Sequence, residues 1–249
     1  MKKYGLLGYP LTHSFSKRYF TERFETENID STYDNFEIDS ITKFQDVVKD
    51  NPEVIGFNVT IPYKEQVIPY LDELNDSAKE IGAVNTIRVT RTENGVHLKG
   101  FNTDTFGFES SLKPLLKDHH KKALILGTGG ASKALKYVLS KLGIEYISAS
   151  IEELQENEIR YEDVNQQVIS ERLLIINATP LGTYPKVETF PNIPYEFITD
   201  KHLLFDLVYN PEVTQFMAKG KAKGATVKNG YEMLLNQAKK AYEIWNSEE

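Results

Sequence analysis

The stretch Lys122-Ala-Leu-Ile-Leu-Gly-Thr-Gly-Gly-Ala-Ser132 decides the fold of the second half of this chain. Its apolar residues 122–126 predict a buried strand, and the pattern over residues 131–142 predicts a helix. A strand that enters a helix through a glycine-rich turn commonly receives a dinucleotide pyrophosphate, because the backbone is open and the helix start offers free N–H groups. We therefore predict a dinucleotide-binding domain of the Rossmann type.

The predicted phosphate-binding turn consists of Gly127, Thr128, Gly129, Gly130 and Ala131. Gly127 and Gly129 stand where the chain must turn tightly and let the pyrophosphate approach the backbone. Ser132 replaces the third glycine of the usual fingerprint, and its small side chain still permits close packing of helix on strand. The alternative interpretation is a glycine-rich turn that binds no ligand.

The choice between NADP and NAD depends on the residues about 20 positions after the first glycine, where an acidic residue favours NAD and an arginine favours NADP. This chain has Ser148-Ala149-Ser150-Ile151-Glu152 there. The hydroxyl of Ser148 suits the ribose of either cofactor, and Lys133 is within reach of a phosphate. The sequence leaves both cofactors open.

Alternating strands and helices extend over the whole chain and predict an α/β fold. In the first hundred residues we expect strands at 4–7, 33–38 and 54–60, helices at 16–28, 41–51 and 64–71, and a hairpin at 86–90 and 95–99. Further along we expect helices at 105–116, 214–221 and 231–245 and strands at 145–149, 173–177, 203–206 and 226–227. Residues 151–172 are acidic, and we expect a surface helix or a long loop. The strand and helix pattern of the first hundred residues gives way to a second pattern near residues 101–105, which indicates two domains.

The composition excludes several classes of protein. With 249 residues, 40% hydrophobic and 26% charged, the chain is typical of a globular protein. No apolar run is long enough to span a membrane, so we expect no membrane as a partner. A net charge of −7 disfavours nucleic acid as a partner. The absence of cysteine excludes disulfides and thiolate metal sites, and the scattered histidines predict no metal. We expect a cytoplasmic location.

Two ionisable residues stand in short polar clusters that follow hydrophobic runs. They are Lys64, which follows Gly56-Phe-Asn-Val-Thr-Ile-Pro-Tyr63, and Asp104, which follows Gly100-Phe-Asn-Thr103. A lysine beside a carboxylate can hold a hydroxyl and exchange a proton with it, as alcohol oxidation or ketone reduction requires. Together with a dinucleotide site, this pair predicts hydride transfer. The alternatives are a solvated lysine and an aspartate that caps a helix.

Other polar residues at strand ends are candidates for substrate binding. Ser14 and Ser16 lie two residues apart in an extended segment, so both hydroxyls can face one carboxylate, although either serine would also suit a helix cap. Asn58, Thr60 and Asn85 supply uncharged donors and acceptors for hydroxyl groups. They form one pocket only if their strands are neighbours.

These motifs resemble the shikimate dehydrogenase family along nearly the full chain. The resemblance rests on eight blocks in order, namely Gly8-Tyr-Pro-Leu-Thr-His-Ser-Phe-Ser16, Asn58-Val-Thr-Ile-Pro-Tyr-Lys64, Gly82-Ala-Val-Asn-Thr86, Asn102-Thr-Asp104, Gly127-Thr-Gly-Gly-Ala-Ser132, Asn177-Ala-Thr-Pro-Leu-Gly182, Asp206-Leu-Val-Tyr-Asn-Pro211 and Asn229-Gly-Tyr-Glu-Met-Leu-Leu-Asn-Gln237. It implies NADPH-dependent, reversible reduction of 3-dehydroshikimate to shikimate in chorismate and aromatic amino acid biosynthesis. It also implies an N-terminal α/β substrate domain at 1–103, a Rossmann-type NAD(P)-binding domain at 104–231, and a helix at 232–249 that packs back on the first domain.

The resemblance further implies a role for each matching residue. Ser14 and Ser16 would hold the substrate carboxylate, with Tyr209 closing that end. The ring hydroxyls would be bound by Asn58, Thr60, Asn85, Asp104 and Gln237. Lys64 would donate a proton to the developing alkoxide, while Asp104 orients the substrate. The nicotinamide side would be lined by Asn177, Thr179 and Gly230.

One departure from the family affects the cofactor, because Ser148-Ala149-Ser150 replaces the basic segment that reads the 2′-phosphate. The runner-up function is therefore a quinate/shikimate dehydrogenase that uses NAD. A third reading is a nucleotide-binding regulatory homologue without catalysis. We expect a small-molecule substrate in each enzymatic case, and a monomer or a homodimer.

Overall fold

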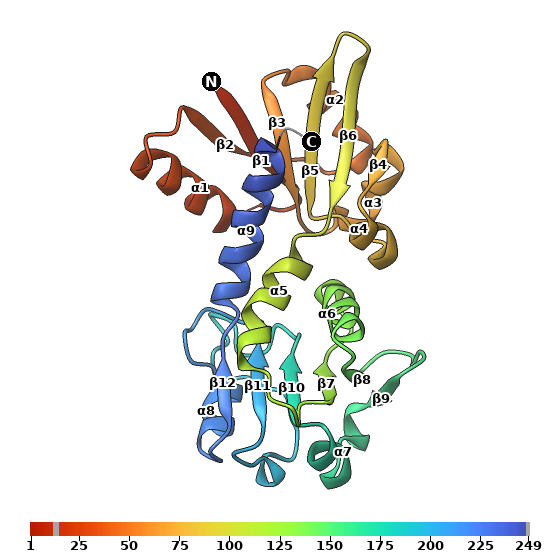
Figure 1. Cartoon of the computed structure of the whole chain (residues 1–249), viewed down its shortest axis with the longest axis vertical. Helices are drawn as coiled ribbons and strands as arrows, with labels where there is room; N and C mark the ends of the chain where they lie inside the picture. Colours follow the sequence, from red (N-terminus) through yellow and green to blue (C-terminus); the bar gives the residue numbers. More distant parts are fainter. Residues whose placement is uncertain (12–14, 248–249) are drawn as a thin grey trace. The chain divides into compact units, whose positions relative to one another are not determined.

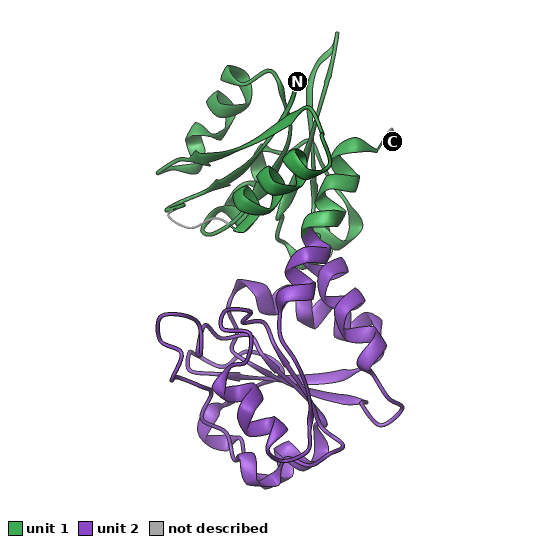
Figure 2. Cartoon of the chain, turned by 90° about the vertical axis from the view of Figure 1, so that its left-hand side faces the viewer, with its two compact units in different colours: residues 1–103, 238–249 green, residues 104–237 purple. Residues whose placement is uncertain are grey.

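The computed structural model describes residues 1–11 and 15–247, and its α/β chain divides into two compact units. Unit 1 comprises Met1–Thr103 and Ala238–Glu249, and unit 2 comprises Asp104–Gln237 (Figure 2). The second boundary falls inside the last helix. Each unit is built around its own six-stranded sheet, so the α/β prediction is confirmed.

The sheet of unit 1 has the order β2-β1-β3-β5-β6-β4 and mixes parallel and antiparallel pairs (Figure 1). Its strands are β1 (Lys2–Gly8), β2 (Ser31–Glu37), β3 (Val54–Val59), β4 (Glu73–Leu74), β5 (Thr86–Thr92) and β6 (Gly95–Phe101). The expected hairpin is confirmed, since β5 and β6 pair antiparallel from Thr86 and Phe101 to Thr92 and Gly95. The strand β1 lies between two parallel neighbours, which places the carboxyl ends of β1, β2 and β3 on one edge.

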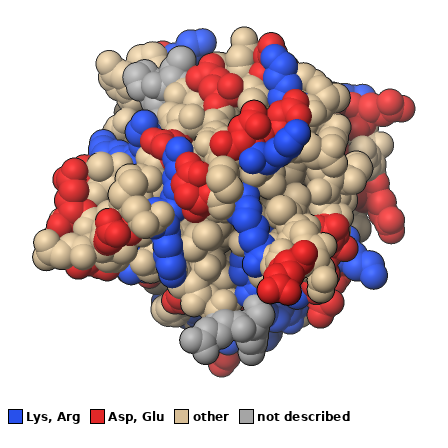
Figure 3. All heavy atoms as spheres, turned by 90° about the horizontal axis from the view of Figure 1, so that it is seen from above, with Lys and Arg blue, Asp and Glu red and all other residues tan. Residues whose placement is uncertain are grey.

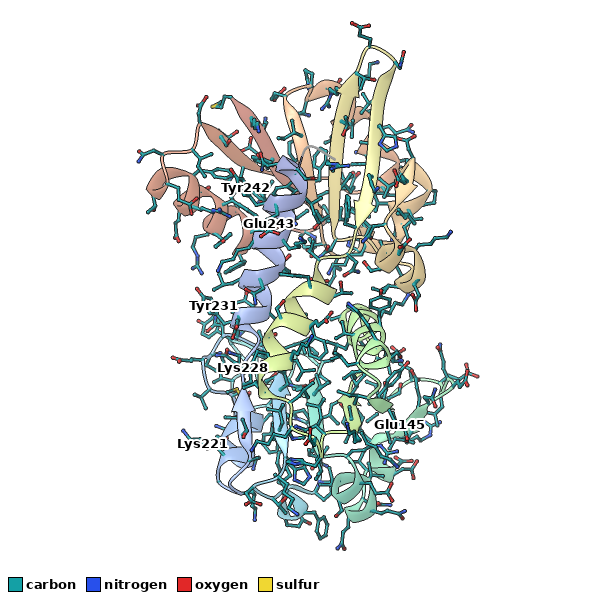
Figure 4. All side chains as sticks on the ribbon, in the orientation of Figure 1. Glu145, Lys221, Lys228, Tyr231, Tyr242 and Glu243 are labelled. Atoms are coloured by element: carbon teal, nitrogen blue, oxygen red, sulfur yellow. The ribbon has the colours of Figure 1, made fainter. Side chains whose placement is uncertain are left out.

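Helices cover both faces of this sheet. One face is covered by α1 (Phe15–Thr26) and the end of α9 (Tyr231–Asn246), and the other by α2 (Phe44–Asp50), α3 (Tyr63–Gln66) and α4 (Asp76–Ile81). Tyr242 lies on α9 (Figure 4), and its ring centroid is 6.3 Å from that of Phe20 and 6.0 Å from that of Phe24, both of α1. Trp245 donates from Nε1 to the carbonyl oxygen of Ile87 at 3.0 Å. These contacts attach the chain's last helix to its first sheet.

The sheet of unit 2 has the order β12-β11-β10-β7-β8-β9, and every pair in it is parallel. Its strands are β7 (Lys122–Leu126), β8 (Glu145–Ser150), β9 (Glu158–Arg160), β10 (Leu174–Asn177), β11 (Leu203–Asp206) and β12 (Thr226–Lys228). One face packs on α5 (Asp104–Leu112), α6 (Gly130–Lys141) and the start of α9, the other on α7 (Gln166–Glu171) and α8 (Gln215–Lys221). All strands therefore end at the same edge, where ligands of such sheets bind.

Two predicted helices are shorter than expected because prolines interrupt them. The helix expected at 64–71 ends at Gln66, and a short 3₁₀ turn, Ile68–Tyr70, follows with Pro69 inside it. The helix expected at 105–116 ends at Leu112, before Pro114. Proline has no N–H for the helical ladder and clashes with the preceding turn.

Three short elements were not expected from the sequence. They are β4, α4 and β9. The strand β9 lies in the acidic segment 151–172, where it adds three residues to the edge of β8, and α7 follows it. Elements this short carry too few residues to display a period.

Acidic and basic side chains lie interspersed on the face of the molecule seen in Figure 3. Within residues 1–11 and 15–247, no helix has the length and the hydropathy that crossing a membrane requires.

Candidate active site

Tyr33 connects two of the predicted substrate residues in unit 1. Its hydroxyl donates to Oδ1 of Asn58 at 2.8 Å and also hydrogen-bonds the Ser16 side chain. Since the single phenolic proton is given to Asn58, Ser16 acts as the donor in the second bond. Burial raises the pKa of Tyr33 far above its ordinary value, so this hydroxyl stays protonated. Ser14 lies outside the described residues.

Asn58 is itself held inside the protein. Its side chain is 5% exposed, and Nδ2 lies 3.4 Å from both the carbonyl oxygen of Asn85 and Oγ1 of Thr86. Both polar ends of the amide thus have internal partners, which orients it rigidly.

Asn85 presents a donor rather than an acceptor. Its buried Oδ1 accepts from the backbone N–H of Thr103 at 2.7 Å, from Thr103 Oγ1 at 3.1 Å and from Thr86 Oγ1 at 3.1 Å. Among the described residues its NH₂ group has no hydrogen-bond partner. The amide is therefore fixed with its donor side free for a ligand hydroxyl.

Lys64 is anchored to the same segment through its backbone. Its carbonyl oxygen accepts from the N–H of Val84 at 2.7 Å, and the lysine is half-buried in α3. The helix is entered from Thr60, whose carbonyl oxygen accepts from the N–H of Tyr63 at 2.9 Å and whose own N–H donates to Leu7 at 2.9 Å. Lys64 and Thr103 are thus held to adjacent residues, Val84 and Asn85.

Asp104 is the first residue of α5 and follows Thr103 directly. The glycine one turn later brings α5 close to α9, because a Cβ at Gly107 would lie 2.5 Å from the carbonyl oxygen of Met233 and 3.2 Å from Cβ of Gln237. Gln237 is 8% exposed and donates from Nε2 to Leu234 at 2.9 Å. Asp104 and Gln237 therefore come from two closely packed helices of unit 2.

The glycine-rich turn of unit 2 has the geometry that a diphosphate requires. Gly127 has a φ of +101°, and a Cβ there would lie 2.9 Å from Cγ2 of Thr179. Gly129 precedes the first turn of α6, and a Cβ at Gly129 or Gly130 would meet nothing within 4 Å. The open backbone and the free N–H groups of Gly130 and Ala131 fit the pyrophosphate of a dinucleotide.

Ser148 lies within β8 and is completely buried, and its hydroxyl has no partner among the described residues. Ser150, two residues on, lies at the strand end beside the glycine-rich turn. Its Oγ is 3.4 Å from Oγ1 of Thr128 and accepts from the N–H of Glu152 at 3.1 Å. The strand-end position that reads the ribose in this fold is therefore held by Ser150, which the sequence did not single out.

Asn177 ends β10 and organises the chain beside Gly127. Its Oδ1 accepts from the N–H of Thr179 at 3.1 Å and from Thr179 Oγ1 at 2.6 Å. Its Nδ2 donates to Oδ1 of Asp206 at 2.9 Å. Burial raises the pKa of Asp206 to about 6. Spacing gave no signal for this carboxylate, because its partner is 29 residues away.

Gly230 lies where the backbone leaves no room for a side chain, since a Cβ would lie 2.1 Å from the carbonyl oxygen of Leu207. Tyr209, in the same region, is 39% exposed. The described residues contain no group of three or more His, Asp or Glu side chains arranged for a metal ion.

Comparison with known proteins identifies the family. The model of the shikimate dehydrogenase substrate binding domain matches residues 6–87. The chain is 36% identical to the shikimate dehydrogenase (NADP(+)) of Methanosphaera stadtmanae, over 97% of this chain and 90% of the relative.

Solved structures agree over the whole length. The shikimate 5-dehydrogenase of Thermus thermophilus, in complex with NADP(H) and shikimate, has a TM-score of 0.83 at 29% identity and covers 99% of this chain and 94% of its own. That of Listeria monocytogenes, in complex with shikimate and NAD, has a TM-score of 0.86 at 28% identity and covers 98% and 91%. This chain belongs to the shikimate dehydrogenase family.

Proposed function

We propose that this chain catalyses the reversible, NADP-dependent reduction of 3-dehydroshikimate to shikimate, a step of chorismate and aromatic amino acid biosynthesis. The observation that carries the proposal is the match to relatives named shikimate dehydrogenase (NADP(+)) over 97% of the chain. The Thermus thermophilus structure, which contains both NADP(H) and shikimate, supports the same pair of ligands.

The two ligands divide between the two units. Unit 2 receives NADP, with the pyrophosphate on Gly127, Thr128, Gly129, Gly130 and Ala131, the ribose at the end of β8 near Ser148 and Ser150, and the nicotinamide beside Asn177, Thr179 and Gly230. The fit rests on the open backbone at Gly129 and Gly130, where α6 begins. When bound, NADP supplies or accepts the hydride.

Unit 1 receives the substrate. Ser14 and Ser16 bind its carboxylate, with Tyr209 of unit 2 as a further contact. Asn58, Thr60, Asn85 and Gln237 bind its ring hydroxyls. For Asn85 this role is supported by the fixed amide, whose NH₂ group is the side turned away from Thr103. The net charge of −7 makes such local neutral donors important for capturing an anion.

Lys64 exchanges the proton of the reaction. In the reductive direction its ammonium donates a proton from Nζ to the oxygen that becomes the hydroxyl, and in oxidation the neutral amine takes that proton back. Asp104 accepts a hydrogen bond from the substrate and orients it. Because the developing alkoxide is charged only late in the reaction, the lysine lowers the barrier more than it strengthens substrate binding.

We also propose a cytoplasmic location and a monomeric or homodimeric state. A chain without cysteine is compatible with a reducing compartment. Light scattering on the purified protein would decide between the two assemblies.

The experiment that tests this function is a set of four initial rates. Shikimate and quinate are each oxidised with NADP and with NAD, and the absorbance of the reduced nicotinamide is followed. We expect turnover of shikimate with NADP. Turnover of quinate, or a preference for NAD, would identify the protein as a catabolic quinate/shikimate dehydrogenase. If the protein binds dinucleotide but all four combinations are inactive, it would be a regulatory homologue without catalysis.

A further inference from the structure

Asp206 occupies the centre of a hydrogen-bond network at the ligand-binding edge of unit 2. It ends β11, and its side chain is completely buried. Oδ1 accepts from Nδ2 of Asn177 at 2.9 Å and from the N–H of Val208 at 3.0 Å, while Oδ2 accepts from Oγ1 of Thr214 at 2.5 Å. Burying a carboxylate is costly, so its retention here calls for a role.

Each branch of this network extends beyond Asp206. Through Asn177 it reaches Thr179, whose methyl carbon limits the space at Gly127. Through Val208, whose carbonyl oxygen accepts from the N–H of Gly230 at 3.2 Å, it reaches the start of α9. Thr214 instead caps α8, because its Oγ1 accepts from the N–H of Met217 at 3.3 Å. Two branches thus lead to proposed cofactor residues, and the third is structural.

The carboxylate determines which way the amide of Asn177 points. An ionised Asp206 is only an acceptor, so Asn177 must turn Nδ2 towards it and Oδ1 towards the two donors of Thr179. An amide at position 206 would offer an NH₂ group instead. Such an amide keeps the bonds from Asn177 and Val208 when its oxygen takes the place of Oδ1 and its NH₂ faces Thr214. A side chain without an acceptor at position 206 instead leaves Nδ2 of Asn177 with only the carbonyl oxygen of Leu181, at 3.4 Å.

We propose that Asp206 is a positioning residue of the dinucleotide site, whose carboxylate orients Asn177 and thereby holds Thr179 beside Gly127. The inference rests on the proposed function, because it assumes that this edge receives NADP. Asp206 itself does not touch the cofactor in this account.

The test compares three variants. Asp206→Ala removes the acceptor that Asn177 and Val208 share. Asp206→Asn keeps an acceptor in the place of Oδ1 and removes the charge, with its NH₂ group facing Thr214. Thr214→Val removes the structural branch and serves as the matched control, with a loss of about 1 kcal/mol in stability expected from the lost cap.

Two quantities are measured for each variant. The first is the Kd of NADP by calorimetric titration, and the second is the hydrogen-exchange rate of the Thr179 amide without ligand. We expect Asp206→Ala to raise the Kd roughly ten- to hundredfold, as for loss of a hydrogen bond to a charged group, and to accelerate exchange at Thr179. Asp206→Asn should retain most of the NADP affinity and of the exchange protection, and Thr214→Val should change neither.

Unchanged NADP affinity in Asp206→Ala would overturn this inference, and so would an Asp206→Asn variant as defective as Asp206→Ala, since either result shows that the acceptor at position 206 does not position Asn177. A folded wild-type protein that binds no dinucleotide would instead contradict the proposed function itself. In that case the exchange rates still report whether Asp206 holds Thr179 in place.

Discussion

The candidate ligand sites of the two units are built from different groups, side chains in unit 1 and backbone in unit 2. In unit 1 the candidate residues are side chains tied to one another, as Tyr33 is to Asn58 at 2.8 Å and Asn85 to Thr103 at 2.7 Å. In unit 2 the site is mostly backbone, with Gly127 at a φ of +101° and an open turn at Gly129. We infer that the substrate is recognised by oriented amides and hydroxyls, and the cofactor by free N–H groups.

The largest effect should follow the loss of the proton donor in unit 1. We expect Lys64→Ala to lower kcat by about 10² to 10⁴, the usual contribution of a general acid or base, and to change the KM of shikimate much less. Steady-state rates of shikimate oxidation measure both constants. Lys79→Ala, which removes an exposed lysine of α4, is the control and should match the wild type. A Lys64→Ala variant with full kcat would contradict the proposed role.

The second effect is a pH dependence of stability that only unit 2 should show. The buried carboxyl group of Asp206 in unit 2 titrates near neutral pH, whereas the buried phenol of Tyr33 in unit 1 stays protonated there. The folded protein raises the pKa of Asp206 from 3.8 to about 6. The native state therefore holds this proton more tightly than the unfolded state. Its contribution to stability is fully present below pH 3.8 and is lost as the pH rises through about 6.

This contribution can be isolated by subtracting the free energy of unfolding of Asp206→Asn, whose side chain at position 206 does not ionise, from that of the wild type. We expect the free energy of unfolding of the wild type to fall relative to Asp206→Asn by roughly 3 kcal/mol between about pH 4 and pH 7. Urea denaturation at several pH values measures the difference. A difference that stays constant over this range would show that the burial of Asp206 does not perturb its pKa.

A third effect tests the backbone character of unit 2. Gly127→Ala should raise the Kd of NADP about tenfold or more, because the side chain strains a left-handed backbone and displaces Thr179. Gly143→Ala is the matched control, since Gly143 also has a positive φ, +68°, but a Cβ there meets nothing within 4 Å. Both variants should lose stability. Equal NADP affinities in the two would remove the special role of Gly127.

The smallest effect concerns the hydroxyl of Tyr33. Tyr33→Phe leaves Oδ1 of Asn58 buried without its donor, which should cost about 1–3 kcal/mol of stability and raise the KM of shikimate a few-fold. Tyr4→Phe removes another hydroxyl of unit 1, bonded to Asn246 at 3.0 Å, and should leave that KM unchanged. If both variants shift the KM equally, Tyr33 has no particular connection to the site.

The same contrast explains what the sequence could predict. The site of unit 2 lies in one continuous stretch, so the strand, the turn and α6 were predictable from local pattern alone. The site of unit 1 joins distant segments, and Tyr33 and Asn58 are 25 residues apart. The family resemblance grouped Ser16, Asn58 and Asn85 as substrate residues, but nothing in the sequence connected Tyr33 to them. Ser148 was predicted for the ribose rather than Ser150, and no role was predicted for Asp206, because both roles depend on which strands are neighbours, which no local pattern encodes.

The division of work between the units can be tested most directly by titrating NADP into Lys64→Ala and Gly127→Ala by calorimetry. The account predicts that Lys64→Ala binds NADP as the wild type does, while Gly127→Ala binds it about tenfold more weakly or worse. If Lys64→Ala lost NADP affinity and Gly127→Ala kept it, the assignment of substrate to unit 1 and cofactor to unit 2 would be contradicted.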